Sequence, residues 1–181
     1  MNIFSFKLIT PEHFLLLFQW FSQDYIAQLW VEPTEWTAFQ TTWNAKIAEP
    51  GVFRYLAYLD NKPIGYIQYF RVTDKDRAHF SDVQLPDHSI GLELFIGDQE
   101  YLGKGYGTRL IQDFIELIQV KEPACSTIII DPAPDNVRAI KCYEKVGFKR
   151  VGIFTTPYGP KGAGPGQIML MIYENNLRNS K

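Results

Sequence analysis

Three glycines stand at alternate positions in the segment Leu102-Gly103-Lys104-Gly105-Tyr106-Gly107-Thr108. An apolar run precedes the segment at residues 91–96, and residues 110–118 follow it with apolar side chains at helical spacing. The glycines therefore connect a predicted strand to the first turn of a predicted helix. Because glycines leave backbone N–H groups accessible and a helix N-terminus is partly positive, this loop suits a phosphate or a diphosphate. A glycine-rich turn without a ligand is the alternative.

The spacing of this glycine loop excludes two common nucleotide motifs. The loop lacks the Gly-x-x-x-x-Gly-Lys-Ser/Thr pattern of a P-loop. Its alternating glycines also do not fit the Gly-x-Gly-x-x-Gly pattern of dinucleotide-binding proteins. The glycine loop therefore fits neither of these two classes of phosphate-binding motif.

The composition is that of an ordinary globular protein. The chain has 181 residues, of which 46% are apolar and 21% are charged, and this favours one domain with a sizeable core. A net charge of −2 argues against a nucleic-acid partner. Two cysteines, with no Cys/His cluster at zinc spacing, predict neither a disulfide framework nor a metal site. Without a leader pattern or a membrane span, we expect a soluble cytoplasmic protein, either a monomer or a homodimer.

The pattern of apolar residues and turn residues predicts a chain that alternates strands with helices. Predicted strands cover 3–8, 53–59, 64–72, 91–96, 126–131, 148–155 and 167–173. Predicted helices cover 12–21, 37–48, the segment after the glycine loop, and 136–146. We expect residues 25–36 to be irregular and 73–89 to form a long polar loop. Between the last two strands, seven of the ten residues from 157 to 166 are Gly or Pro, which suits either a lip over a site or an exposed hairpin loop.

A second motif joins the glycine loop to a known family. The block from Asp131 to Phe148 resembles the signature Asn-x-x-Ala-x-x-x-Tyr-x-x-x-Gly-Phe of the GNAT acyltransferases, with Asn136 and Tyr143 at two of its named positions. The glycine loop resembles the coenzyme A diphosphate loop of that family, although Leu102 replaces the usual Gln or Arg. The resemblance implies a single GNAT domain over 1–181, with its core at about 6–173. Its fold class would be α+β, with a central mixed, mostly antiparallel sheet flanked by helices.

Within this family the chain is most similar to aminoglycoside 6′-N-acetyltransferases. The similar strings are residues 61–68, 102–105, 131–134 and 155–157. Leu102 is shared with that group. The resemblance implies an acetyl-CoA-dependent transfer of acetyl to an amine, by direct attack in a ternary complex, with a small polycationic acceptor.

The resemblance also implies which residues hold acetyl-CoA. The loop amides would bind the diphosphate, and the backbone of Phe95 and Ile96 would pair with the pantetheine arm, one amide serving as oxyanion donor. Asn136 would contact the arm or act as a helix N-cap, and Lys104 would aid binding or remain a solvated charge. The full predicted cofactor set is Phe95, Ile96, Gly103, Lys104, Gly105, Gly107, Thr108 and Asn136.

Three residues are candidates for the chemistry. Tyr143 matches the family position of a general acid that protonates the departing thiolate, the alternative being a half-buried structural ring. Glu93 shares a strand face with Phe95 if residues 91–96 alternate, and Asp131 is at the C-terminal end of the predicted strand 126–131. Either acid could take the amine proton or hold a cation. As alternatives, Glu93 could be a solvated strand residue and Asp131 a turn residue.

The segment 74–100 contains seven acids and only two Lys or Arg residues, an imbalance that favours a polycationic acceptor. By resemblance, Trp30, Tyr55 and Phe80 would supply aromatic faces to this acceptor, together with Glu93 and Asp131.

Two alternative functions stay open. The first is a GNAT acyltransferase for another amine, such as a siderophore hydroxylysine or a protein N-terminus. The second is a non-catalytic acyl-CoA sensor.

Overall fold

The computed structural model describes residues 2–80, 82–157 and 165–174. One sheet of seven strands crosses it in the order β1-β2-β3-β4-β5-β7-β6. The strands are β1 (Phe4–Leu8), β2 (Val52–Leu59), β3 (Lys62–Arg71), β4 (Ile90–Ile96), β5 (Thr127–Ile130), β6 (Lys149–Thr156) and β7 (Gly166–Glu174). The helices are η1 (Pro11–His13), α1 (Phe14–Phe21), α2 (Asp24–Ala27), α3 (Trp36–Ile47), α4 (Asp74–Ala78), η2 (Gln99–Tyr101), α5 (Tyr106–Lys121) and α6 (Val137–Val146).

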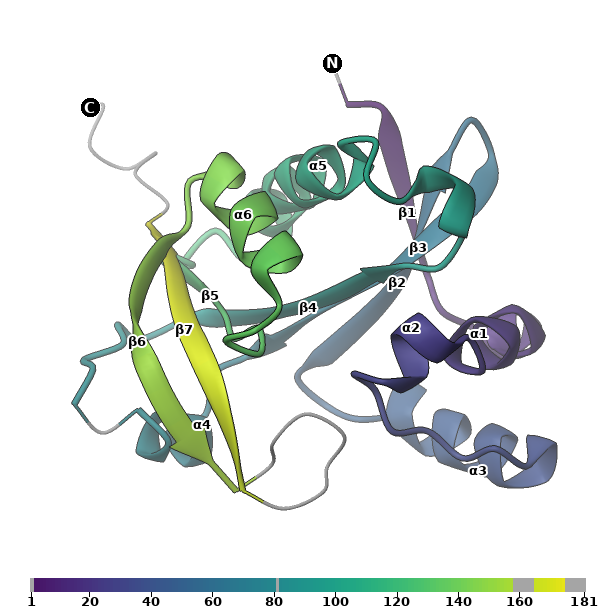
Figure 1. Cartoon of the computed structure of the whole chain (residues 1–181), viewed down its shortest axis with the longest axis horizontal. Helices are drawn as coiled ribbons and strands as arrows, with labels where there is room; N and C mark the ends of the chain where they lie inside the picture. The colour runs from purple at the N-terminus through teal and green to yellow at the C-terminus, as the bar shows by residue number, and fades with distance from the viewer. Residues whose placement is uncertain (1, 81, 158–164, 175–181) are drawn as a thin grey trace.

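Helices cover both faces of the sheet (Figure 1). Helices α5 and α6 pack on one face, where a core that includes Leu92, Phe114 and Ile128 is buried. Helices α1, α2 and α3 pack on the other face over an aromatic core that includes Trp43 and Tyr66. This arrangement confirms the predicted α+β class, with a mixed sheet flanked by helices.

The pairing of β4 with β5 is parallel, unlike all other pairings in the sheet. This pairing joins only Ile90 with Ile128 and Gly91 with Ile129. Within the described residues, the two strands therefore separate after Gly91. The remaining length of β4, Leu92–Ile96, consequently has one edge that β5 does not cover. Such an edge presents free backbone N–H and C=O groups to a ligand.

Most predicted elements lie within one or two residues of the observed ones, but the two helices α2 and α4 and the short 3-10 helix η2 were not predicted. Helix α2 lies in the segment that we expected to be irregular. Helix α4 lies in the expected polar loop, where Thr73 and Asp76 form a capping box at its start. Asp60 and Asn61 both have positive φ, so the predicted hairpin turn contains two residues and β3 begins earlier than expected.

Part of the predicted 157–166 loop, residues 158–164, lies outside the described residues. Among the helices that the structure describes, none combines the length and apolarity needed to cross a bilayer.

Candidate active site

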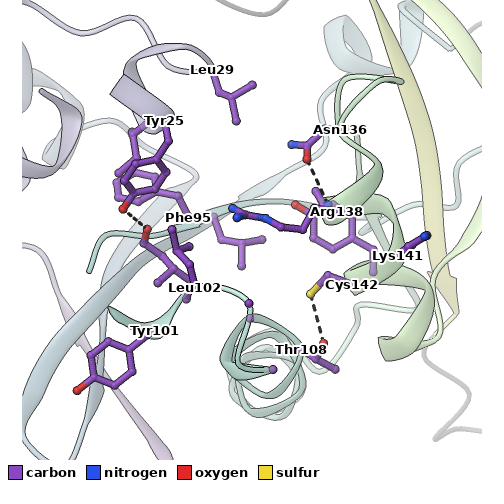
Figure 2. A pocket seen from close by; sticks show the side chains of 18 of the residues that line it. Tyr25, Leu29, Phe95, Tyr101, Leu102, Thr108, Asn136, Arg138, Lys141 and Cys142 are labelled. Atoms are coloured by element: carbon purple, nitrogen blue, oxygen red, sulfur yellow. Dashed lines mark hydrogen bonds between the residues drawn. The ribbon is translucent and has the colours of Figure 1, made fainter. Parts of the chain in front are cut away.

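A pocket of about 340 Å³ opens where β4 separates from β5. One wall is formed by α2 and the residues after it, and the opposite wall by α6 (Figure 2). The glycine loop and the start of α5 close one end. The pocket therefore lies between the helices of the two sheet faces and follows the free edge of β4.

The glycine loop ends in a helix start that carries no side-chain cap. Gly105 is the N-cap of α5 with φ of 86°, and Gly103 has φ of 73°, values that side-chain-bearing residues rarely adopt. The first N–H groups of a helix have no carbonyl four residues earlier within the helix. Because glycine has no capping side chain, the N–H groups of the first turn are left for a ligand, and the helix dipole favours an anion there.

The other predicted cofactor residues near this loop divide into two groups. Gly103, Gly105, Gly107, Thr108 and Asn136 line the pocket. The Asn136 side chain accepts a hydrogen bond from the backbone N–H of Ala139 at 3.2 Å, so Asn136 caps α6 and also faces the pocket. The side chain of Lys104 is exposed and is absent from the pocket lining, which leaves it as a charge outside the cavity.

Phe95 and Ile96, the two positions predicted to hold the pantetheine arm, direct their backbone peptide groups to opposite edges of β4. The N–H of Gly97 donates to the carbonyl of Ile64 at 2.9 Å, and Phe95 pairs with Tyr66. Since alternate residues of an antiparallel pair direct their peptide groups to the partner strand, those of Phe95 face β3. This corrects the expectation for the Phe95 amide. The peptide groups of Leu94 and Ile96 face the open edge.

Several pocket residues were not found from the sequence. Arg138, Lys141 and Lys145 lie at i, i+3 and i+7 on α6 and line the pocket, giving it a basic wall. Figure 2 shows Arg138 reaching from α6 into the pocket. Their spacing in the sequence could have predicted that these three side chains lie on one face of the helix. On the opposite wall, the Tyr25 hydroxyl donates to the carbonyl of Ile96 at 2.8 Å, and this contact has no local sequence signature.

Glu93 lies on the sheet face opposite to Leu92, as the predicted alternation of β4 requires. Its carboxylate accepts a hydrogen bond from Gln68 Nε2 at 2.7 Å, and the Gln68 carbonyl oxygen accepts one from the Tyr66 hydroxyl. Desolvation raises the pKa of Glu93, whereas Arg54 and the Gln68 hydrogen bond act in the opposite direction. Glu93 is thus held in a fixed polar environment.

Asp131 follows β5 directly, and it lies within electrostatic reach of Glu93 on β4. Desolvation raises the pKa of Asp131 to about 7, with further contributions from the carboxylates of Glu93 and Asp76. Asp131 is nevertheless an exposed residue. It is therefore a carboxyl group that can gain and lose a proton near neutral pH, with a path to water.

Tyr143 lies on α6 and lines the pocket, with 9% of its surface exposed. Burial raises the pKa of its hydroxyl, and Cys142, Asp131 and Glu93 raise it further, while Arg138 lowers it. The hydroxyl is consequently a neutral hydrogen-bond donor at neutral pH. The separation of β4 from β5 explains how a residue of α6 comes within electrostatic reach of acids on the other sheet face.

The three aromatic residues predicted for the acceptor have different positions. Trp30 lines the pocket and packs edge-on against Phe95 at 5.6 Å between ring centroids. Tyr55 is buried in the core under α5, where it contacts Phe114, so its ring lies on the sheet face away from Glu93. Phe80 is 5% exposed and packs against the core below α4. These positions correct the predictions for Tyr55 and Phe80, whose rings pack inside the protein.

The predicted acidic wall is also divided by the fold. Asp98 and Glu100 pair with Lys62 beyond the end of β4, with the shorter contact at 2.7 Å. Asp76 is in the capping box of α4 and also acts on the pKa of Asp131. Of the acids in the segment 74–100, only some therefore lie near Glu93 and Asp131. Among the residues that the structure describes, no cluster of three or more His, Cys, Asp or Glu could hold a metal ion.

The class of protein follows from comparison with known proteins. Residues 10–156 match the model of the acetyltransferase (GNAT) domain. The chain belongs to this family.

More specific similarities are to enzymes that modify aminoglycosides. Aminoglycoside N(6′)-acetyltransferase type 1 of Klebsiella pneumoniae is 32% identical over 160 residues, which span 86% of this chain and 79% of the relative. The crystal structure of AAC(6′)-Ib with coenzyme A and kanamycin superposes with a TM-score of 0.79 at 30% identity, over 95% of both chains. The structure of AAC(6′)-Ib with ribostamycin and coenzyme A also gives a TM-score of 0.79, at 28% identity, over 99% of this chain and 100% of the other.

Proposed function

We propose that this protein transfers acetyl from acetyl-CoA to an amine, and that the acceptor is the 6′-amine of aminoglycoside antibiotics. The observation that carries the proposal is a pocket that runs from the glycine loop to Tyr143, with the carboxyl groups of Glu93 and Asp131 close enough to act on the pKa of the Tyr143 hydroxyl. The similarity to aminoglycoside N(6′)-acetyltransferases supports the choice of acceptor.

The pocket fits the parts of coenzyme A. The uncapped first turn of α5 would hold the diphosphate, with the α6 cations Arg138, Lys141 and Lys145 adding positive charge. The free edge at Leu94 and Ile96 offers peptide groups to the amides of the pantetheine arm. Acetyl-CoA, when bound, supplies an acetyl group activated as a thioester.

Asp131 is our candidate for the residue that receives the amine proton. A primary ammonium group must lose a proton before its nitrogen can attack a carbonyl carbon. A general base is most effective when its pKa lies near the working pH, and the pKa of Asp131 is raised to about 7. Since Asp131 remains in contact with solvent, the proton can leave to water.

Tyr143 is our candidate for the donor to the thiolate that leaves as the new amide bond forms. Because its pKa is raised, its hydroxyl carries a proton throughout the neutral range. Donation of a hydrogen bond or a proton from Tyr143 Oη would offset the negative charge on sulfur as the carbon–sulfur bond breaks. An amide on the free edge of β4, Leu94 or Ile96, is placed to donate to the carbonyl oxygen.

The acceptor would approach from the side of Glu93 and Trp30. An anionic Glu93 attracts an ammonium group, and the Trp30 indole offers a face for cation–π contact or stacking on a sugar ring. An acceptor with several ammonium groups would be attracted by the combined negative charge of Glu93, Asp131 and Asp76.

We also propose that the whole chain is one acetyltransferase domain that works in the cytoplasm as a monomer or homodimer. Cys142 carries a free thiol, a state that the reducing cytoplasm maintains. Light scattering after size-exclusion chromatography would decide between the two oligomeric states.

A thiol-release assay with acetyl-CoA tests the function. The acceptor panel should contain kanamycin, ribostamycin, N-hydroxylysine and a peptide with a free N-terminus. We expect turnover with the aminoglycosides and acetylation of their 6′-amine, located by NMR of the product. Turnover with the other amines alone would contradict the proposed acceptor, and binding of coenzyme A without any turnover would contradict the enzymatic role.

A further inference from the structure

A row of polar side chains crosses three neighbouring strands, β2, β3 and β4, and ends at the residue that follows β5. The antiparallel register pairs Arg54 of β2 with Gln68 of β3, and Gln68 with Glu93 of β4. Asp131 follows the end of β5 and lies close enough to Glu93 for the charge of Glu93 to act on it. Paired residues on adjacent strands point to the same sheet face. The row therefore begins with a cation and ends with the carboxyl group that we propose as the base.

Arg54 is buried, although it carries a full charge, with 9% of its surface exposed. One guanidinium nitrogen donates to the backbone carbonyl of Lys46 in the last turn of α3, where the helix dipole favours a cation. Another donates to Glu49 at 2.6 Å. Glu49 has half of its side chain exposed, so this partner offsets the buried charge incompletely.

Glu93 is the nearest carboxylate along the row. Gln68 bridges the two ends, because its Nε2 donates to Glu93 at 2.7 Å and its own strand position is opposite Arg54. The charge of Arg54 favours the ionised form of Glu93, and the charge of Glu49 disfavours it. Among the described residues, the side chains that act on Asp131 are the carboxylates of Glu93 and Asp76, and none of them is a cation. The two carboxyl groups of the site thus have unequal electrostatic surroundings.

We propose that Arg54 is a positioning residue that keeps Glu93 anionic, so that Glu93 anchors the acceptor ammonium and leaves Asp131 to take up the proton. This inference rests on the proposed acetyl transfer and assigns separate tasks to its two acids. Two adjacent carboxyl groups with different surroundings commonly divide the binding and proton-transfer tasks in this way. Without Arg54, both carboxyl groups would compete for a proton in the same pH range.

The test must account for all charged and titratable groups that act on Glu93 or face it. These groups come from β2 and the segment before it, from α3, from β3, from the end of β5 and from α6. They are Arg54, Glu49, Lys46, Tyr66, Asp131 and Tyr143. Two of them, Arg54 and Glu49, act on Glu93 with opposite sign and can be neutralised by isosteric or near-isosteric substitutions.

The experiment measures the ionisation of Glu93 directly, by NMR titration of the enzyme labelled with ¹³C at the glutamate side-chain carboxyl carbon. Comparison with Glu93→Gln assigns the signal. Arg54→Gln should move the Glu93 titration upward by at least about half a pH unit, because a cation is removed. Glu49→Gln, at a half-exposed position, should move it downward, because an anion is removed. Arg71→Gln and Glu144→Gln, which alter surface ion pairs, serve as matched controls.

Opposite displacements in the two variants would support the inference, since general destabilisation cannot produce both signs. A Glu93 titration that is the same in wild type, Arg54→Gln and Glu49→Gln would overturn it. The acid limb of the pH profile for kcat/KM should follow the same directions. Because the NMR titration needs no acceptor, this result is independent of the thiol-release assay, whose failure would contradict the proposed function instead.

Discussion

Asp131 and Glu93 illustrate how the fold makes two similar residues chemically different. Glu93 belongs to β4 and Asp131 follows β5. Desolvation by nearby protein atoms raises the pKa of both carboxyl groups, although Glu93 is half-buried and Asp131 is exposed. Only Glu93 has a buried arginine two strands away and a hydrogen-bonded glutamine beside it. The sequence identified both acids but not the difference between them, because the difference depends on cross-strand partners.

The raised pKa of Asp131 predicts a pH-dependent stability effect. Between about pH 4 and pH 7 the unfolded carboxyl group is ionised while the folded one retains its proton, so the stability of the wild type falls as pH rises and then levels off. Asp131→Asn removes this loss. We expect the Tm of the variant, relative to wild type, to increase from pH 4.5 to pH 7.5 in differential scanning calorimetry. A constant difference across that range would show that the pKa of Asp131 is ordinary.

Tyr143→Phe tests the proposed donor to the leaving sulfur. The ring can stay in the core while the hydroxyl is lost, so we expect kcat to fall at least about tenfold. The affinity for coenzyme A, measured by calorimetry, should change little. An unchanged kcat would remove Tyr143 from the reaction and leave it as a structural ring.

At the scale of elements, the start of α5 differs from that of α6, because α5 has no side-chain cap and its N-cap is a glycine. Gly105 has positive φ at the N-cap, whereas Asn136 caps α6 with its side chain. This contrast could be predicted from the sequence, since the glycines and the asparagine occupy motif positions. The wall facing α6 could not be predicted, because α2 contains only four residues and its pocket contacts depend on tertiary packing.

Comparing Gly105→Ala with Gly107→Ala should distinguish the effect of backbone conformation on coenzyme A binding from the effect of an added methyl group. Alanine at 105 has open space but must adopt a left-handed conformation that costs about 1 kcal/mol, and it would tilt the amides of the first turn. Alanine at 107 would meet only Cys142 Sγ at 3.4 Å, an ordinary contact. We expect the Kd for coenzyme A to rise at least about fivefold in the first variant and to change less in the second. Equal affinities in the two variants would contradict a cradle formed by backbone geometry.

At the scale of the whole molecule, the separation of β4 from β5 creates the site. It exposes one edge of β4 to the coenzyme and lets α6 approach acids on the opposite face. The sequence motifs predicted the order of the elements and the family of folds. They did not predict that Tyr55 and Phe80 would be buried in the cores, because aromatic residues at strand and loop positions look alike whether they face a core or a ligand.

The cohesion of the sheet with its helices depends partly on one buried acid remote from the site. The Asp113 carboxylate of α5 accepts hydrogen bonds from the N–H groups of Ile3 and Phe4, the latter at 3.0 Å, and pairs with Arg109. Asp113→Ala would leave these groups without their acceptor, so we expect a loss of about 2–4 kcal/mol in the free energy of unfolding. Chemical denaturation measures this loss. At a temperature where the variant is folded, kcat should be close to wild type, and a large decrease would show that α5 transmits the change to the pocket.

The most direct test of the account is a crystal structure of the enzyme with coenzyme A and kanamycin bound together. We expect the diphosphate on the backbone amides of residues 103–108 and the coenzyme sulfur beside Tyr143 Oη. The 6′-nitrogen should lie within hydrogen-bonding distance of Asp131 or Glu93. A diphosphate bound elsewhere, or an acceptor amine remote from both carboxylates, would contradict the assignment of this pocket as the site of acetyl transfer.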